Sequence, residues 1–212
     1  MICAESITFK YPHGDAPAIK EFSAQFMRGE ITAISGSNGC GKTTLTKLLT
    51  GILRPSSGCV TIDGSNTDGM SLFEIGQRVG YVFQNPSRQL FCGTVYDEVA
   101  YGLRNLRMDE AQIEQKVSIY LELFDLAKHR VTFPGKLSFG EKQRLALAAV
   151  LALGTSYLVL DEPTTSLDAR RQHELGDTLI KLRQEQNCGI IVVSHADDFI
   201  DRYTDRELVM TR

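Results

Sequence analysis

The chain has 212 residues, of which 42% are hydrophobic and 23% charged, and its formal net charge is −3. This length supports one α/β domain with a sizeable core, and a mildly acidic chain without a basic block gives no support for nucleic-acid binding, so no nucleic-acid partner is expected. The longest strongly apolar run, residues 145–153, is about half the ~20 residues that a membrane span requires, and the N-terminus has no signal-peptide pattern, so any membrane role is expected to be peripheral, from the cytoplasmic side.

Residues 1–35 are predicted to be rich in β-strands. Ile7, Phe9 and Tyr11 alternate with polar residues, and residues 22–26 repeat that pattern, as strands with one buried face do. Residues 31–34 form a short apolar strand.

Directly after this strand comes the pattern G-x-x-x-x-G-K-[ST], which is typical of a phosphate-binding loop. Glycines allow backbone N–H groups to point at a phosphate, and the helix that begins near Lys42 adds the positive end of its dipole. Lys42 is expected to contact the β and γ phosphates and Thr43 to ligate Mg²⁺. The expected nucleotide-binding residues here are Gly36, Ser37, Asn38, Gly39, Cys40, Gly41, Lys42, Thr43 and Thr44.

The helix after the loop is expected to present Leu45, Leu48, Leu49 and Ile52 on one apolar face. The five cysteines are scattered, which favours a reducing compartment and gives no zinc pattern. Cys40 is the exception of interest: it is either a small residue of the loop or a thiol whose alkylation inhibits and which ATP protects.

Further along, residues 60–64 and 79–83 are predicted strands, and the character becomes helical from about residue 85. Asp109 and Gln112 have the spacing of a helix cap, and the apolar face that follows is Ile113, Val117, Leu121 and Phe124. Residues 157–160 and 190–193 are continuous apolar runs, which suit central strands of a parallel sheet covered on both faces.

Two carboxylates, Asp161 and Glu162, follow the strand at 157–160. In ATPases with this loop, the acid at the strand end helps to hold Mg²⁺, which assigns that role to Asp161. Glu162 is expected to position or deprotonate the attacking water. An Asp-Glu pair at a strand-to-loop turn is common, so the assignment depends on the upstream loop.

Ser138 and Glu141 have capping-box spacing at the start of a helix that runs through Leu153. This is either a well-capped helix only, or a second anion site made by Ser138 and Gly140 at a helix N-terminus. Two such helix ends, far apart in sequence, suggest that two subunits exchange them.

The order of these motifs resembles the nucleotide-binding subunit of ABC transporters over nearly the whole chain. Tyr11 matches the aromatic that stacks on adenine, Gln84 the glutamine loop, and residues 137–144 the signature motif. Residues 166–168 resemble the loop after the carboxylate pair, and His195 matches the switch histidine.

The resemblance implies a P-loop α/β core with a mainly parallel sheet, an N-terminal antiparallel β subdomain and an inserted helical subdomain near residues 86–150, all in one domain of residues 1–212. It implies two subunits, identical or not, that face head to tail and trap two ATP between the Lys42 loop of one and Ser138 of the other. Gln84 would sense the γ-phosphate or its Mg²⁺, and His195 would help to fix the attacking water. Glu162, His195, Lys42 and Gln84 are thus the expected catalytic residues, and Thr43, Gln84 and Asp161 the expected metal-site residues.

One position departs from the family pattern. The third residue of the signature is usually glycine and here is Phe139, whereas Gly140 is kept. Phe139 is expected to be tolerated by projecting away from the nucleotide.

The stretch from Phe83 to Gly102 resembles the energy-coupling-factor and cobalt-type importers. It implies a transmembrane coupling protein that contacts this region and a small membrane component that captures a vitamin or transition-metal ion. Leu90, Phe91 and Tyr101 are otherwise ordinary subdomain core. The competing hypotheses are a soluble ABC ATPase of DNA repair or translation, and a nucleotide-binding module without turnover, against which Glu162 argues.

Overall fold

The computed structural model describes residues 1–165 and 167–211. Its strands are β1 (Ile2–Phe9), β2 (Ile19–Phe26), β3 (Ile31–Gly36), β4 (Ser57–Ile62), β5 (Ser65–Asn66), β6 (Val79–Val82), β7 (Tyr157–Asp161), β8 (Gly189–Val193) and β9 (Arg206–Met210). Its α-helices are α1 (Lys42–Leu49), α2 (Leu72–Gly76), α3 (Val95–Asn105), α4 (Glu110–Leu123), α5 (Phe139–Ala152), α6 (Ala169–Gln186) and α7 (Asp197–Tyr203).

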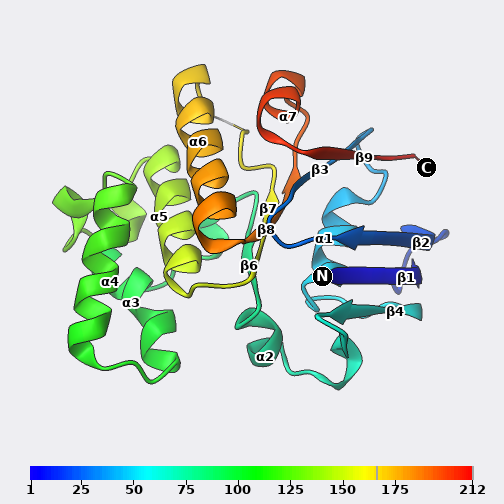
Figure 1. Ribbon diagram of the computed structural model, residues 1–212, viewed down its shortest axis with the longest axis horizontal. Coiled ribbons are helices and arrows are strands. Elements are labelled where there is room, and N and C mark those ends of the chain that lie inside the picture. The colour runs from blue at the N-terminus through cyan, green and yellow to red at the C-terminus, as the bar shows by residue number, and fades with distance from the viewer. Residues whose placement is uncertain (166, 212) are drawn as a thin grey trace.

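The strands form two sheets, as predicted. One is antiparallel in the order β2-β1-β4-β5, and the other is parallel in the order β6-β7-β8-β3-β9. Figure 1 shows the helices α3 and α4 at one end of the molecule and the strands β1, β2 and β4 at the other, with the parallel sheet between them.

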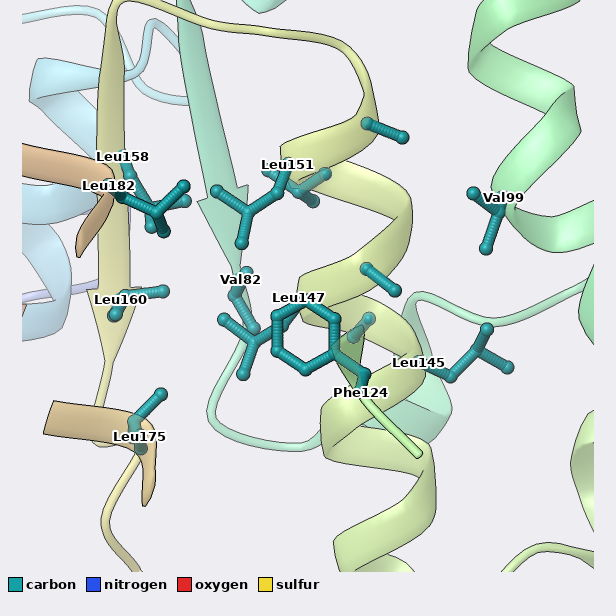
Figure 2. Packing of buried hydrophobic residues seen from close by; sticks show 14 of the residues in the cluster. Val82, Val99, Phe124, Leu145, Leu147, Leu151, Leu158, Leu160, Leu175 and Leu182 are labelled. Carbon is teal, nitrogen blue, oxygen red and sulfur yellow. The ribbon is translucent and has the colours of Figure 1, made fainter. Parts of the chain in front are cut away.

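The central strands are buried on both faces, which confirms the interpretation of their continuous apolar sequences. Leu158 and Leu160 of β7 pack toward α5 and α6, together with Phe124 and Leu147 (Figure 2). Val159 of the same strand belongs to a second cluster that includes α1 and the antiparallel sheet. The alternation of side chains along a strand therefore divides one apolar run between two cores.

Two local expectations were wrong. The helix α1 ends at Leu49, because Gly51 takes a positive φ of 69° as residues after a helix end often do, and Ile52 is left 41% exposed instead of continuing the buried face. Strand β1 ends at Phe9, so Tyr11 lies in the following loop, half-exposed.

The helical segment agrees with its predicted pattern. Asp109 caps α4 by accepting a hydrogen bond from the N–H of Gln112, and the buried face is the predicted one. Across the residues that the structure describes, no helix combines the length and the apolar character needed to cross a membrane.

The topology explains where function can lie. β6, β7, β8 and β3 are adjacent and parallel, so the loops that follow them open along one edge of the sheet. In open α/β sheets this carboxyl edge is where ligands bind.

Candidate active site

The phosphate-loop residues connect β3 to α1. Gly36 and Gly41 have φ values of 132° and 105°. Residues that carry a Cβ rarely adopt such positive φ angles, whereas glycine does so readily. A Cβ at Gly41 would also lie 2.6 Å from the carbonyl oxygen of Ala18, so glycine is required both for its conformation and for its lack of a side chain.

Lys42 is buried within this loop. Its Nζ donates hydrogen bonds to the carbonyl oxygens of Gly36, at 2.8 Å, and Ser37, at 3.0 Å. The loop is therefore held in a closed curve by its own lysine. The exposed residues Ser37, Asn38 and Gly39 form the outer part of the curve, and their backbone is accessible to an incoming phosphate.

Cys40 lies on the inner side of the loop. Its thiol is buried in the core cluster behind the curve, 4.0 Å from the Nζ of Lys42. All five cysteines are free. This burial favours the interpretation of Cys40 as a small packing residue.

Thr43 and Asp161 meet at the predicted metal position. The Thr43 hydroxyl donates to Oδ1 of Asp161 at 3.3 Å, and Tyr81 donates its hydroxyl to Oδ2 at 3.2 Å. Asp161 is 4% exposed, and this burial raises its pKa above the ordinary value, with the neighbouring Glu162 adding to the shift. An incoming cation would compensate that buried negative charge, so a hydroxyl and a carboxylate in contact fit Mg²⁺.

Tyr81 was not predicted as part of the site. Its hydroxyl contacts Asp161 and, at 3.2 Å, the hydroxyl of Thr46 on α1. Burial, followed by the charge of Asp161, raises the pKa of this phenol, so it stays a hydrogen-bond donor at neutral pH. It bridges the metal-site acid to the helix that follows the phosphate loop.

Glu162 is contacted by two of the predicted residues. Gln84 donates from Nε2 to Oε2 at 3.3 Å, and Nε2 of His195 lies 3.3 Å from Oε1. Thr165, which the motif analysis did not select, donates its hydroxyl to Oε2 at 3.1 Å. The ends of β6, β7 and β8 thus place a glutamine, a carboxylate and a histidine in one cluster.

The backbone at Glu162 is unusual. Its φ is 52°, in the left-handed region, and its N–H donates to the carbonyl oxygen of Val193 at 3.0 Å. A non-glycine residue in this conformation carries a cost of the order of 1 kcal/mol or more and is found disproportionately at functional sites. Here it turns the carboxylate out of the strand toward Gln84 and His195.

His195 is positioned by the turn after β8. Ser194 is fully buried, accepts a hydrogen bond from the N–H of Ala196 at 3.1 Å and contacts the Thr164 hydroxyl at 3.0 Å. This turn presents the His195 ring, which is about 41% exposed, at the mouth of the site.

Tyr11 lies at the other end of the phosphate loop. Its ring packs edge-on against Phe9, and its hydroxyl lies 3.2 Å from the hydroxyl of Thr44. The ring is 40% exposed, which leaves a face free for a base. Stacking on adenine stays a prediction.

Ser138 and Gly140 lie at the N-terminus of α5, and the predicted capping box is present. Ser138 accepts a hydrogen bond from the N–H of Glu141, whose carboxylate accepts from the N–H of Ser138 at 2.9 Å. Within the described part of the chain, no hydrogen bond joins this helix end to the Lys42 loop. Ser138 is thus engaged in capping its own helix.

Phe139 lies next to the predicted site of its own chain. It lines a hollow of about 410 Å³ together with Thr43, Gln84, Asp161 and Thr165. Phe139 is 40% exposed, and its direction relative to a nucleotide held by a second subunit stays a prediction. A larger hollow, of about 660 Å³, lies between α5 and α6, and its lining includes Gly140 and Arg144 of the signature stretch and Asp168.

Part of the predicted loop after the carboxylate pair, Ser166, lies outside the described residues. The remainder has a clear structural role, because the Asp168 side chain caps α6 by accepting a hydrogen bond from the N–H of Arg171 at 2.9 Å.

Sequence comparison gives relatives along the whole chain. The family model described as "ABC transporter" matches residues 19–165. A protein of Pyrococcus furiosus, provisionally named an ABC transporter ATP-binding protein, is 42% identical over 211 residues, which are 100% of this chain and 80% of the relative. A Vibrio vulnificus protein with the same kind of name is 36% identical over 210 residues, but there the chain spans only 36% of the relative's length.

Structural comparison agrees. The structure of cbiO1 from Clostridium perfringens, described as part of the ABC transporter complex cbiONQ, superposes with a TM-score of 0.88 at 34% identity, covering 99% of this chain and 84% of that one. A dimeric ATP-binding cassette in a post-hydrolysis state, bound to ADP and Pi, gives a TM-score of 0.90 at 25% identity. The superposition covers 100% of this chain and 94% of that one.

The predicted fold is confirmed. The chain belongs to the ABC transporter family as an ATP-binding domain, and its enzymatic activity is the hydrolysis of ATP.

Proposed function

We propose that this chain is the ATPase subunit of an importer of the energy-coupling-factor type, at the cytoplasmic face of the membrane. Its partners would be a second ABC ATPase subunit, a transmembrane coupling protein and a small membrane component that binds the solute. The solute class would be a vitamin or a transition-metal ion such as cobalt or nickel. The similarity to cbiO1, which is part of the cbiONQ complex, supports this branch of the family.

In the proposed reaction, water attacks the γ-phosphorus of ATP, the bond from phosphorus to the bridging oxygen breaks, and ADP and phosphate leave. Glu162 accepts the proton of the attacking water, and His195 and Gln84 hold the carboxylate and the water in line. Their contacts with Glu162, each at 3.3 Å, support these roles.

Lys42 would give up its carbonyl partners to contact the β and γ phosphates, as a mobile charge on a short loop can. Thr43 and Asp161 would hold Mg²⁺ together with the phosphates, with Gln84 near the same ion. When bound, the ion offsets the negative charge of the phosphates.

The second subunit is required by this proposal. Ser138 and Gly140 offer a helix N-terminus that is not used by the Lys42 loop of the same chain, and such ends bind phosphate. A head-to-tail pair would bring this end to the partner's nucleotide.

The observation that carries the importer assignment is an exposed aromatic pair, Phe91 and Tyr101. The two rings meet edge-to-face with centroids 4.9 Å apart, and they are 66% and 48% exposed. An apolar pair on a segment that begins at Gln84 marks a surface for a protein partner rather than core packing.

A pull-down from gently solubilised native membranes tests the proposal, with bound proteins identified by mass spectrometry. We expect a polytopic coupling protein and a small membrane protein to be recovered with the parent chain. Phe91→Glu should lose both, because a charge would be buried in an apolar contact.

Val209→Glu is the matched control. Val209 is similarly exposed, at 61%, but lies on β9, at the opposite edge of the parallel sheet from β6. It should retain both membrane proteins. Recovery of only soluble or nucleic-acid-associated proteins would instead favour a non-transport ATPase.

A further inference from the structure

The segment between β6 and α3 contains both Gln84, which contacts Glu162 in the candidate active site, and Phe91, which is exposed on the surface. Its first half is a hydrogen-bonded turn: Asn85 accepts from the N–H of Ser87 at 3.0 Å, and the N–H of Leu90 donates to the carbonyl of Pro86 at 3.3 Å. The segment is therefore ordered by its own contacts rather than a loose linker.

The inner end is fixed by Gln89. Its Nε2 donates to the carbonyl oxygen of Tyr81 at 3.1 Å, and its Oε1 accepts from the N–H of Phe83 at 3.3 Å. One side-chain amide thus satisfies a donor and an acceptor at the end of β6. Phe83 is the residue directly before Gln84, so Gln89 holds the backbone from which Gln84 projects.

The outer end is fixed by Glu98 of α3. This carboxylate is only 6% exposed, and its Oε2 accepts from the N–H of Phe91 at 3.0 Å and the N–H of Cys92 at 2.7 Å. A buried carboxylate is costly unless hydrogen-bonded, and such bonds are among the stronger ones in proteins. Glu98 therefore ties the backbone that carries Phe91 to the same helix that carries Tyr101.

We propose that Gln89 and Glu98 are positioning residues that make residues 84–92 a rigid connection, so that a displacement of Gln84 on nucleotide binding moves the aromatic pair. This inference rests on the proposed coupling function. Gln89 and Glu98 would contact neither the nucleotide nor the partner, but would couple the nucleotide site to the aromatic pair. Such a coupling role has to be tested by measuring the coupling directly.

The variants separate this role from general stability. Glu98→Leu removes the acceptor of both N–H groups, whereas Glu98→Gln keeps an amide oxygen in that place. Gln89→Leu removes the inner contact. Val99→Ala is the matched control, because Val99 is the fully buried neighbour of Glu98 on α3 and its truncation lowers stability without touching the segment.

The reporter is Phe91→Trp, which gives a single tryptophan because the chain has none. The isolated chain is titrated with MgATP while tryptophan emission is recorded, and affinity is measured in parallel with a fluorescent ATP analogue. We expect MgATP to shift the emission in the reporter chain and in its Val99→Ala and Glu98→Gln versions. Glu98→Leu and Gln89→Leu should lose the shift at unchanged nucleotide affinity, and combining them should add nothing further.

A full emission shift in Glu98→Leu and Gln89→Leu would overturn the inference, as would the absence of a shift in the reporter chain at saturating MgATP. Since this experiment uses no membrane partner, its failure is distinguishable from failure of the importer assignment, which only the pull-down tests.

Discussion

Asp161 is expected to lower the stability of the nucleotide-free fold while it serves the proposed Mg²⁺ site. It is buried and accepts hydrogen bonds from the neutral hydroxyls of Thr43 and Tyr81, and burial raises its pKa above the ordinary value. Because the native state holds this proton more tightly than the unfolded chain, the contribution of Asp161 to the free energy of unfolding falls as pH rises above its ordinary pKa of 3.8. The penalty is complete once the pH passes the raised native pKa.

Asp161→Asn should therefore raise the Tm of the nucleotide-free chain at pH 7, with a gain that shrinks as the pH approaches 4. For a chain of this size each kcal/mol shifts Tm by roughly 2–4 °C. The variant should also lose the rise in Tm that MgATP gives the parent. Differential scanning fluorimetry across this pH range measures both, and a lower Tm of Asp161→Asn at pH 7 would contradict the account.

Single residues also show the limit of motif reasoning. Lys42, Thr43, Asp161 and Glu162 are predictable because each belongs to a short contiguous pattern with a known spacing. The roles of Tyr81 and Thr165 depend on strand order and on the turn after β7, and no local pattern marks them.

At the scale of elements, the N-terminus of α5 has two roles: a capping box that stabilises the helix, and the proposed contact of Ser138 with a partner's nucleotide. Its capping box stabilises the helix whether or not Ser138 binds a partner's nucleotide. The helix α2 has the same box, made by Ser71 and Glu74 on an exposed part of the chain away from the site. The two boxes form a natural matched pair.

Ser138→Ala and Ser71→Ala should each cost about 1 kcal/mol in the free energy of unfolding, measured by urea denaturation. Only Ser138→Ala should lower the ATPase rate, because only that serine faces the second subunit's nucleotide in the proposed dimer. Equal rates in the two variants would leave α5 with a purely structural cap.

Helix ends are predictable from the sequence where a capping residue or a glycine close to the end determines them. Asp109 and Ser138 cap their helices as predicted, whereas Ile52 lies outside the buried face because α1 ends before Gly51, which has a positive φ. The position of Phe139 beside Thr43 and Gln84 could not be predicted, since it depends on how the helical segment lies against β6 and β7.

At the scale of the whole molecule, we propose that a working nucleotide site needs the Lys42 loop and Glu162 of one subunit and Ser138 of another. In a head-to-tail pair with two-fold symmetry, each subunit contributes both halves, to different sites. Residue contacts within one chain are consistent with this: Glu162 contacts Gln84 and His195, whereas the Ser138 side chain, in the described part of the chain, is hydrogen-bonded to Glu141 of its own helix.

Complementation of ATPase activity tests this claim most directly. Glu162→Gln alone should lose about 10²–10⁴-fold in rate, and Ser138→Arg alone should be similarly inactive because the bulky side chain blocks the shared site. Mixed in equal amounts, the two chains should recover about a quarter of the parent activity per subunit, because in a statistical mixture half of the dimers carry one intact site. A mixture that stays as inactive as its components would contradict the shared site.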